Sequence, residues 1–185
     1  KNFIKYVINE RTLKNINIHK QKPKKRSGAT YIRPSWILPL IKNIKALKKD
    51  TDHQEGAHES LVETFYELLG YKKFEEIRRQ QGRIDIAIYY QDSPLIVNEV
   101  KRDWRLTHEY QHVVEQGYGY AQQIDAKYVV ITNGDYYAIY DTSKDRSKAF
   151  SYDKDFVGNF RVTRLERNDL ELINLLKNDN IPNNH

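Results

Sequence analysis

Three charged residues, Asp85, Glu99 and Lys101, lie at the ends of two apolar runs in the stretch GRIDIAIYYQDSPLIVNEVK at residues 82–101. If both runs are strands, Glu99 and Lys101 point to the same side and Val100 to the other. Two carboxylates that a hairpin brings together repel each other, and a hard divalent cation with oxygen ligands relieves that repulsion. A lysine nearby could lower the pKa of a water at the metal or balance charge that develops on a phosphate. The pattern therefore indicates a Mg²⁺ site with Lys101 beside it.

The elements that would position these residues follow from hydrophobic spacing and turn signals. Runs rich in Ile, Val and Tyr indicate strands, and the Asn133-Gly134 dipeptide between two such runs is the strongest short hairpin signal in the chain. Apolar residues that recur every three or four positions indicate helices. We predict strands at residues 71–77, 84–90, 95–101, 128–132 and 136–141, and helices from residue 35 and at residues 57–69, 107–124 (capped by Thr107) and 169–177. This order is typical of an α/β protein with a mixed sheet.

Asp85, followed by Glu99-Val100-Lys101, resembles the D–(x)n–E-x-K signature of the PD-(D/E)xK nuclease superfamily. The core of that superfamily is a helix, an antiparallel hairpin that carries the motif, a second helix and further strands. The resemblance implies a restriction-endonuclease-like core, in which helices flank a mixed central sheet in the order α-β-β-α-β-β. Ile84 stands where the name of the superfamily has proline, which is a common departure.

A longer likeness narrows the family. Gln116 and Tyr120 are four residues apart and share one face of the predicted helix. They resemble the QxxxY motif of the nuclease domain of type I restriction enzyme R subunits, and the likeness to that domain extends over residues 56–141. The resemblance implies that Gln116 and Tyr120 support the active site or contact DNA.

The same resemblance implies roles for the hairpin residues. Asp85 and Glu99 would bind Mg²⁺, for which Mn²⁺ could substitute, and the carbonyl of Val100 would be a further ligand. Lys101 would position or activate the attacking water. These assignments make Asp85, Glu99 and Lys101 the predicted catalytic centre.

The first helix is expected to add a glutamate to the metal shell, because the superfamily places one there. Glu59 and Glu63 are one helical turn apart, so either could face the site. We choose Glu59, which follows Gly56 and lies eleven residues before Gly70, as in resolvase-like members, and keep Glu63 as the second choice.

Charge is distributed unevenly along the chain. Residues 1–50 carry 14 Lys and Arg against two acidic residues, a net charge of +12, whereas residues 51–185 carry 17 against 23, a net charge of −6. Such a basic segment suits a polyanionic partner, although a solubilising arm has the same composition. We therefore predict a basic N-terminal segment (arm plus helix) at residues 1–50 and a PD-(D/E)xK-type nuclease domain with a C-terminal helix at residues 51–185.

Composition excludes several classes of protein. The chain has no cysteine, so disulfides, thiolate zinc sites and cysteine nucleophiles are absent. It has no Walker motif, so we expect no nucleotide cofactor and no motor activity in this chain. Without methionine it is expected to be a processed, trimmed or excised chain, and it has no apolar run long enough for a membrane span. We expect a soluble, cytoplasmic protein of a prokaryote or phage.

The residues and the resemblance together predict a Mg²⁺-dependent DNA endonuclease of the restriction or defence type. Its partners would be DNA and, for cutting both strands, a second copy in a homodimer or a larger restriction-type assembly. Two other functions remain open, namely a non-cleaving DNA-binding or assembly module that keeps the nuclease fold, and a junction-resolving or repair nuclease.

Less specific explanations remain open for each group of residues. The acidic pair and Lys101 could form an exposed hairpin end with an ordinary ion pair. Gln116 and Tyr120 could be a simple pair on a helix surface. Nearby arginines could either contact phosphates or form a solvated face; these are Arg78, Arg79, Arg83, Arg102 and Arg105.

Overall fold

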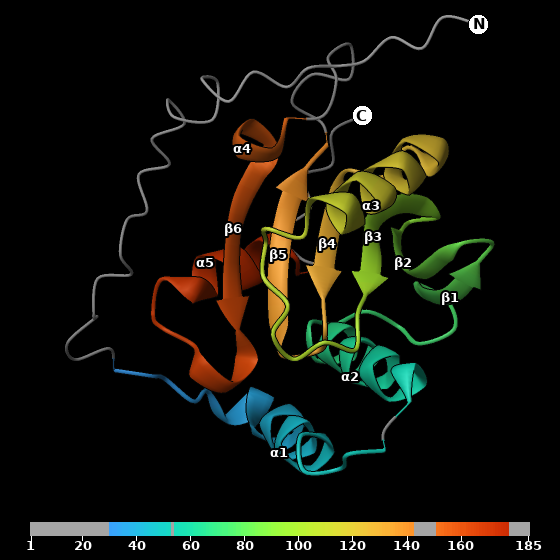
Figure 1. Cartoon of the computed structure of the whole chain (residues 1–185). Helices are drawn as coiled ribbons and strands as arrows, with labels where there is room; N and C mark the ends of the chain where they lie inside the picture. Colours follow the sequence, from blue (N-terminus) through green and yellow to red (C-terminus); the bar gives the residue numbers. More distant parts are fainter. Residues whose placement is uncertain (1–29, 53, 143–150, 178–185) are drawn as a thin grey trace, which may run out of the picture.

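A mixed six-stranded sheet lies at the centre of the computed structural model, which describes residues 30–52, 54–142 and 151–177 (Figure 1). The strands are neighbours in the order in which the chain forms them, and β3 and β4 are parallel while the other pairs are antiparallel. The predicted α/β fold with a mixed central sheet is confirmed. The strands are β1 (Ile77–Gln81), β2 (Ile84–Tyr90), β3 (Ser93–Val100), β4 (Tyr128–Thr132), β5 (Tyr136–Asp141) and β6 (Phe156–Arg161).

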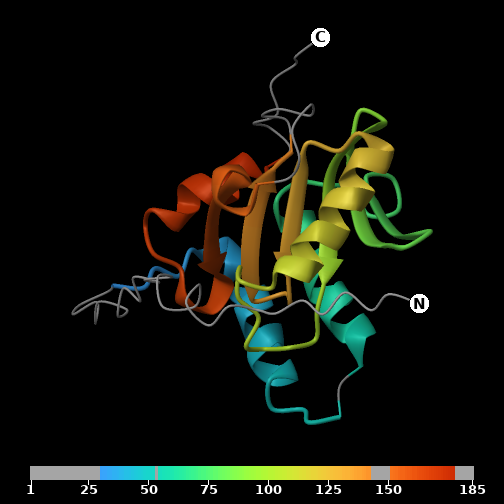
Figure 2. The ribbon, with the colours of Figure 1, turned by 45° about the horizontal axis from the view of Figure 1, so that its top comes forward.

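Helices cover both faces of this sheet. In Figures 1 and 2 the helix α3 crosses one face, and its apolar residues form one core with the strands there. The helices α1, α2 and α5 contribute to a second core on the other face. No helix in the described ranges is long and apolar enough to cross a bilayer. The helical segments are η2 (Ser35–Ile37), α1 (Leu38–Leu47), α2 (Glu55–Leu68), α3 (Gln111–Ile124), α4 (Tyr152–Asp155), η3 (Val162–Arg164) and α5 (Asp169–Leu175).

Strand β3 serves both cores because its side chains alternate between the two faces of the sheet. Ile96 and Val100 are buried in the core of α1, α2 and α5, whereas Val97 is buried in the core of α3. Glu99 has the same parity as Val97, so it lies on the α3 side. The alternation predicted for the end of this strand is therefore present, with Glu99 and Val100 on opposite faces.

The helix predicted from residue 35 is confirmed as a 3₁₀ turn that continues into α1. Pro39 is tolerated because it lies in the first turn of α1. Ile37, Leu40 and Ile44 are fully buried in the core that α2 also lines. The arm at residues 1–29 lies outside the described residues, and the division of the chain at residue 50 stays a prediction.

The predicted strand at residues 71–77 is wrong, because β1 begins only at Ile77. The preceding residues form a turn in which the Glu76 carboxylate accepts a hydrogen bond from the Lys72 backbone N–H at 2.8 Å. Phe74 has a φ of 66°, which lies in the left-handed region and outside the β region of regular strands. A side-chain-to-backbone bond of this kind competes with the strand ladder, and hydrophobic alternation alone does not reveal it.

The predicted cap at Thr107 is also wrong, because α3 begins at Gln111 and its N-cap is Tyr110. The Thr107 hydroxyl instead accepts a hydrogen bond from the Glu109 backbone N–H at 3.4 Å in a local turn. Strand β6 and the short helix α4 were not predicted. Strand β6 lies at the edge of the sheet and contains Gly158, so its propensity for a strand is weak.

The turn between β4 and β5 attaches α2 to the sheet. Gly134 has a φ of 84°, and a Cβ atom at this position would lie 2.7 Å from the Cβ of Leu61. The His58 Nδ1 atom donates a hydrogen bond to the Asn133 carbonyl at 2.8 Å. Only glycine therefore allows this close approach, which brings the first half of α2 to the edge where the parallel strands β3 and β4 end.

Candidate active site

Asp85 lies near the beginning of β2, and its side chain is bonded to the neighbouring strand. Its Oδ2 atom accepts a hydrogen bond from the Val100 backbone N–H at 2.8 Å. Regular pairing of β2 with β3 ends at Ile86 and Asn98, so the carboxylate replaces the next backbone acceptor. The N–H and C=O of one strand residue point to the same side. The Val100 carbonyl therefore faces the side on which Asp85 lies.

Glu99 is buried next to this carboxylate, with a side chain that is 1% exposed. Its Oε1 atom accepts a hydrogen bond from Lys101 Nζ at 2.7 Å. Its Oε2 atom is buried and has no hydrogen-bond partner among the described residues. Lys101 is held in place because its backbone N–H donates to the Thr132 carbonyl of β4 at 2.8 Å. The structure thus brings together Asp85, Glu99 and Lys101, as the sequence predicted.

Burial raises the pKa of both acidic side chains. For Asp85, this effect outweighs the Val100 hydrogen bond and the charge of Lys101, which lower the pKa. For Glu99, burial is again the largest cause, followed by the Lys101 hydrogen bond, which lowers the pKa, and the charge of Asp85, which raises it. The two carboxylates therefore repel each other, and a divalent cation between them would relieve this repulsion.

Of the two glutamates predicted on the first helix, Glu59 is the one whose pKa is affected by the charge of Asp85. Burial raises the pKa of Glu59, Arg79 lowers it, and the charge of Asp85 raises it further. The Glu59 Oε2 atom lies 3.2 Å from Arg79 Nη1. Glu63 binds Arg79 through two hydrogen bonds and lies 3.4 Å from Lys73 Nζ. Glu63 is thus part of an ion-pair cluster, and Glu59 is the better placed of the two.

Sequence reasoning missed a further acidic residue, Glu55, in the first turn of α2. Its charge raises the pKa of Asp85, Glu99 and Glu59, so its side chain lies within electrostatic reach of all three. The signal that could have identified it is the spacing of four residues between Glu55 and Glu59, which places both on one helix face.

Gln116 and Tyr120 lie on α3, which packs over the strand that carries Glu99. The Gln116 Nε2 atom donates a hydrogen bond to the Tyr120 hydroxyl at 3.1 Å. A Cβ atom on the adjacent Gly117 would lie 3.8 Å from the Cβ of Glu99, so the helix backbone passes directly over this residue. The two side chains bond to each other, near the acidic pair but without a hydrogen bond to it in the described part of the chain.

The arginines near the site differ in how they are bound. Arg79 is held by Glu59 and Glu63, and the Arg78 guanidinium lies 4.0 Å from the centre of the Tyr89 ring. Arg105 pairs with Asp103 at 3.3 Å. Arg79 therefore already has carboxylate partners within the protein, so a role in contacting phosphates suits it less than an arginine without such partners. Two arginines are exposed close to the hairpin ends, namely Arg83 and Arg102.

The donors at this edge are suited to a hard cation, although they do not form a complete cluster. Within the described ranges, no group of three or more His, Cys, Asp and Glu side chains is arranged to hold a metal ion. Asp85 and Glu99 supply two carboxylates, of which Glu99 Oε2 is buried without a hydrogen-bond partner among the described residues. The Val100 carbonyl lies on the same side as Asp85. Oxygen donors of this kind fit Mg²⁺ or Mn²⁺.

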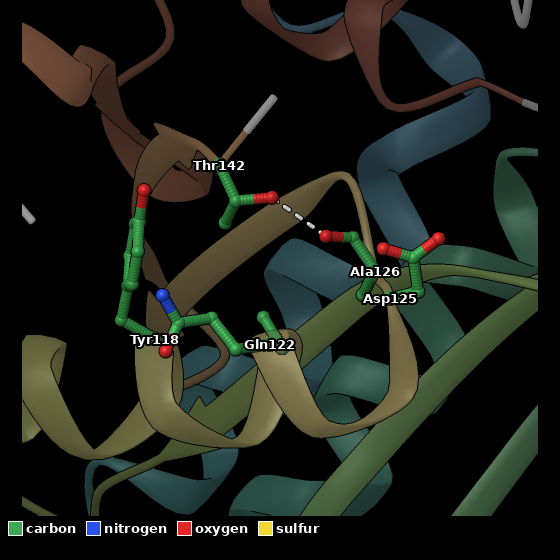
Figure 3. Close-up of a pocket in the computed structure, with 6 residues that line it drawn as sticks. Tyr118, Gln122, Asp125, Ala126 and Thr142 are labelled. Atoms are coloured by element: carbon green, nitrogen blue, oxygen red, sulfur yellow. Dashed lines mark hydrogen bonds between the residues drawn. The ribbon is translucent and has the colours of Figure 1, made fainter. Parts of the chain in front are cut away.

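A separate pocket lies at the far end of α3 (Figure 3). It has a volume of about 240 Å³ and is lined by Tyr118 and Gln122 of α3 and by Thr142, whose hydroxyl donates to the Ala126 carbonyl at 2.6 Å. It adjoins the beginning of β4, where Tyr128 pairs with Asp141. The acidic pair lies at the opposite end of that strand, so this pocket is not part of the candidate site.

Comparison with known proteins identifies one family. The family model described as "Type I restriction enzyme R protein N terminus" matches residues 62–155, which include Asp85, Glu99, Lys101, Gln116 and Tyr120. Glu55 and Glu59 lie just before the matched range. No curated protein and no solved structure matches the chain. The match covers half of the chain, and the protein therefore belongs to the family of type I restriction enzyme R protein N-terminal domains.

Proposed function

We propose that this protein is a Mg²⁺-dependent DNA endonuclease of the restriction type, which hydrolyses a phosphodiester bond with water as the nucleophile. The observation that carries the proposal is the convergence of Asp85, Glu99 and Lys101 where β3 ends. Membership in a restriction enzyme family supports DNA as the substrate. It also supports action in a multi-subunit restriction-type assembly. A homodimer is the alternative that we propose, because two active sites are needed to cut both strands.

Some residues of the site would bind the ion, and another would position the attacking water. Asp85, Glu99 and the Val100 carbonyl would hold Mg²⁺, and Mn²⁺ would substitute for it. When bound, the ion would lower the pKa of a water molecule and offset negative charge on the phosphate. Lys101 would position that water and balance the charge that develops on the phosphate. Glu59, which is paired with Arg79 in this structure, would turn its carboxylate toward the ion to complete the shell.

Residues farther from the acidic pair would bind and orient the DNA. Gln116 and Tyr120 are already bonded to each other on α3 beside Glu99, which supports a role in shaping the site or in contacting the DNA. The basic residues 1–50 would add affinity that does not depend on base sequence, because lysine and arginine neutralise phosphates. Binding should therefore weaken steeply as the salt concentration rises.

Cleavage of supercoiled plasmid tests the proposal directly. We expect nicked or linear products with Mg²⁺ or Mn²⁺ and none with EDTA. Glu99→Gln, Asp85→Asn and Lys101→Ala should each reduce the rate by at least about 100-fold, because each removes a ligand or the group that stabilises charge in the transition state. The matched control is Asp92→Asn on the same hairpin, whose side chain is 98% exposed and which should cleave like the wild type.

Two outcomes would favour other functions. Tight binding of duplex DNA without cleavage under any divalent cation would identify a non-cleaving DNA-binding or assembly module. A strong preference for branched over linear duplexes would identify a junction-resolving or repair nuclease with the same chemistry. Full activity of Lys101→Ala and Glu99→Gln would contradict the proposed site.

A further inference from the structure

A groove with a basic rim runs along α1. Lys42 and Lys45 lie on the helix, Lys49 lies in the turn that follows it, and Arg33 lies before it; all four are exposed. Together with three apolar or small residues they line a groove of about 470 Å³. Its floor is formed by Leu38, Ile41 and Ala46.

The positive charge of this rim is not compensated within the described part of the chain. No acidic residue lines the groove, and none of its four cations forms an ion pair with a described residue. By contrast, the neighbouring Lys48 is bound to the buried Asp135. Like charges that are neighbours on a helix surface, such as Lys42 and Lys45 on α1, repel each other. A polyanion in the groove would remove that repulsion.

The spacing of the lysines fits the phosphate backbone of duplex DNA. A helix rises 1.5 Å per residue, so the span from Lys42 to Lys49 is about 10 Å. Successive phosphates of one DNA strand are about 3.4 Å apart along the duplex axis, so roughly three of them match this span. The apolar floor at Leu38, which is 45% exposed, offers a surface for the sugars between those phosphates.

The groove is connected to the edge of the sheet that carries the candidate site. Lys48, next to Lys49, is bound to Asp135, which follows the turn at the end of β4. Strand β4 ends at Thr132, which pairs with Val100 of β3 in the sheet. The helix that would bind DNA is therefore attached to the same edge of the sheet at which Asp85, Glu99 and Lys101 lie.

We propose that the groove of Arg33, Lys42, Lys45 and Lys49 is a docking surface for the phosphate backbone of duplex DNA. This inference rests on the proposed function, because it takes DNA as the substrate. It assigns sequence-independent affinity to a folded surface on α1, separate from the residues that would hold the metal. The surface carries no base-reading role, so its contribution is the same for every duplex sequence.

The test compares two variants of the full chain that change the net charge equally. One is K42E/K45E/K49E, and the control K154E/R167E/K177E reverses three cations that lie outside the groove. Affinity for a fluorescent duplex is measured in EDTA at several salt concentrations. We expect the groove variant to bind the duplex at least about 10-fold more weakly than the control variant. The slope of log K against log salt should also be smaller in magnitude, by about three, for the groove variant than for the control variant. Melting curves verify folding, and K42Q/K45Q/K49Q gives a milder second variant.

The outcomes separate this inference from the proposed function. Weaker binding by the groove variant, with no cleavage by the wild type under Mg²⁺, would support the docking surface and overturn the nuclease. Cleavage by the wild type, with equal DNA affinity for both charge-reversal variants, would support the nuclease and overturn the docking surface. Loss of binding to a polyglutamate peptide, with unchanged binding to duplex DNA, would identify an acidic protein partner and also overturn the proposal.

Discussion

Glu99 places an ionisable group in a buried position, with only one of its oxygen atoms bonded to a described residue. Lys101 binds Oε1, whereas Oε2 has no hydrogen-bond partner in the described ranges and Asp85 adds a repulsive charge. Burying a carboxylate without full compensation destabilises a folded protein. Strained electrostatics of this kind are concentrated at functional sites, where a ligand supplies the missing partner.

The raised pKa of Glu99 predicts how stability depends on pH. The folded chain binds this proton more tightly than the unfolded chain, so the contribution to the free energy of unfolding is full below the unfolded pKa and is lost as pH rises through the folded pKa. Glu99→Gln does not ionise at this position, so the variant does not lose this contribution as pH rises. In EDTA, the variant should therefore become more stable relative to the wild type as pH rises above about 4.3, the ordinary pKa of glutamate.

Urea denaturation at each pH gives the measurement. The control is Asp92→Asn, whose side chain is 98% exposed. A constant difference between Glu99→Gln and the wild type across the whole range would contradict the effect of burial on the pKa of Glu99.

At the scale of single residues, sequence predicted the centre of the candidate site but not its rim. Asp85, Glu99 and Lys101 could be predicted from the sequence because a strand fixes which side each residue faces. Glu55 could not be predicted, because the direction in which an exposed helix residue points depends on how α2 docks against the Asn133-Gly134 turn. The bound ion and the role of each residue stay predictions.

At the scale of elements, regular periodicity was a reliable guide and local side-chain bonding was not. The hairpin of β2 and β3 and the pair β4 and β5 occur where alternation and turn residues predicted them. The strand predicted at residues 71–77 failed because the Glu76 side chain bonds to the Lys72 backbone. The cap at Thr107 failed because its hydroxyl closes a turn ahead of the helix. Both errors involve contacts that periodicity does not contain.

Two glycines on α3 provide a matched test of how that helix packs. A Cβ atom on Gly117 would lie 2.8 Å from Val129 Cγ1, whereas a Cβ atom on Gly119 would meet no atom within 4 Å. Gly119→Ala should stabilise the protein by up to about 1 kcal/mol through helix propensity. Gly117→Ala should be about 1–3 kcal/mol less stable than Gly119→Ala, because it overpacks a buried contact. Equal urea midpoints for Gly117→Ala and Gly119→Ala would show that α3 lies farther from the sheet than the structure places it.

At the scale of the whole molecule, α1 and the sheet are joined through one buried carboxylate. Asp135 accepts hydrogen bonds from the Thr163 backbone and hydroxyl and forms an ion pair with Lys48. Lys48 also lies 4.9 Å from the centre of the Trp104 ring. Residues that are distant in the chain therefore meet at this carboxylate, which is a contact that sequence spacing could not predict.

Substitution of Lys48 measures this connection. Lys48→Met keeps most of the unbranched side chain but removes the positive charge that pairs with Asp135, whose side chain is 1% exposed. We expect a loss of about 1–2 kcal/mol in the free energy of unfolding, because Lys48 is partly exposed and Thr163 remains bonded. Lys45→Met, at an exposed position without an ion pair to a described residue, is the control and should change stability little. Similar urea midpoints for both variants would show that the ion pair contributes nothing.

The consecutive order of the strands has a consequence for how the molecule folds. Strands β1 to β3 and β4 to β6 form two meanders, and the α3 connection joins them through the parallel pair of β3 and β4. Both acidic residues belong to the first meander, yet the helix that buries Glu99 and the strand that anchors Lys101 come later in the chain. During synthesis the two carboxylates are therefore made before the parts of the chain that enclose them. Asp85, Glu99 and Lys101 reach their final arrangement only when the second meander docks.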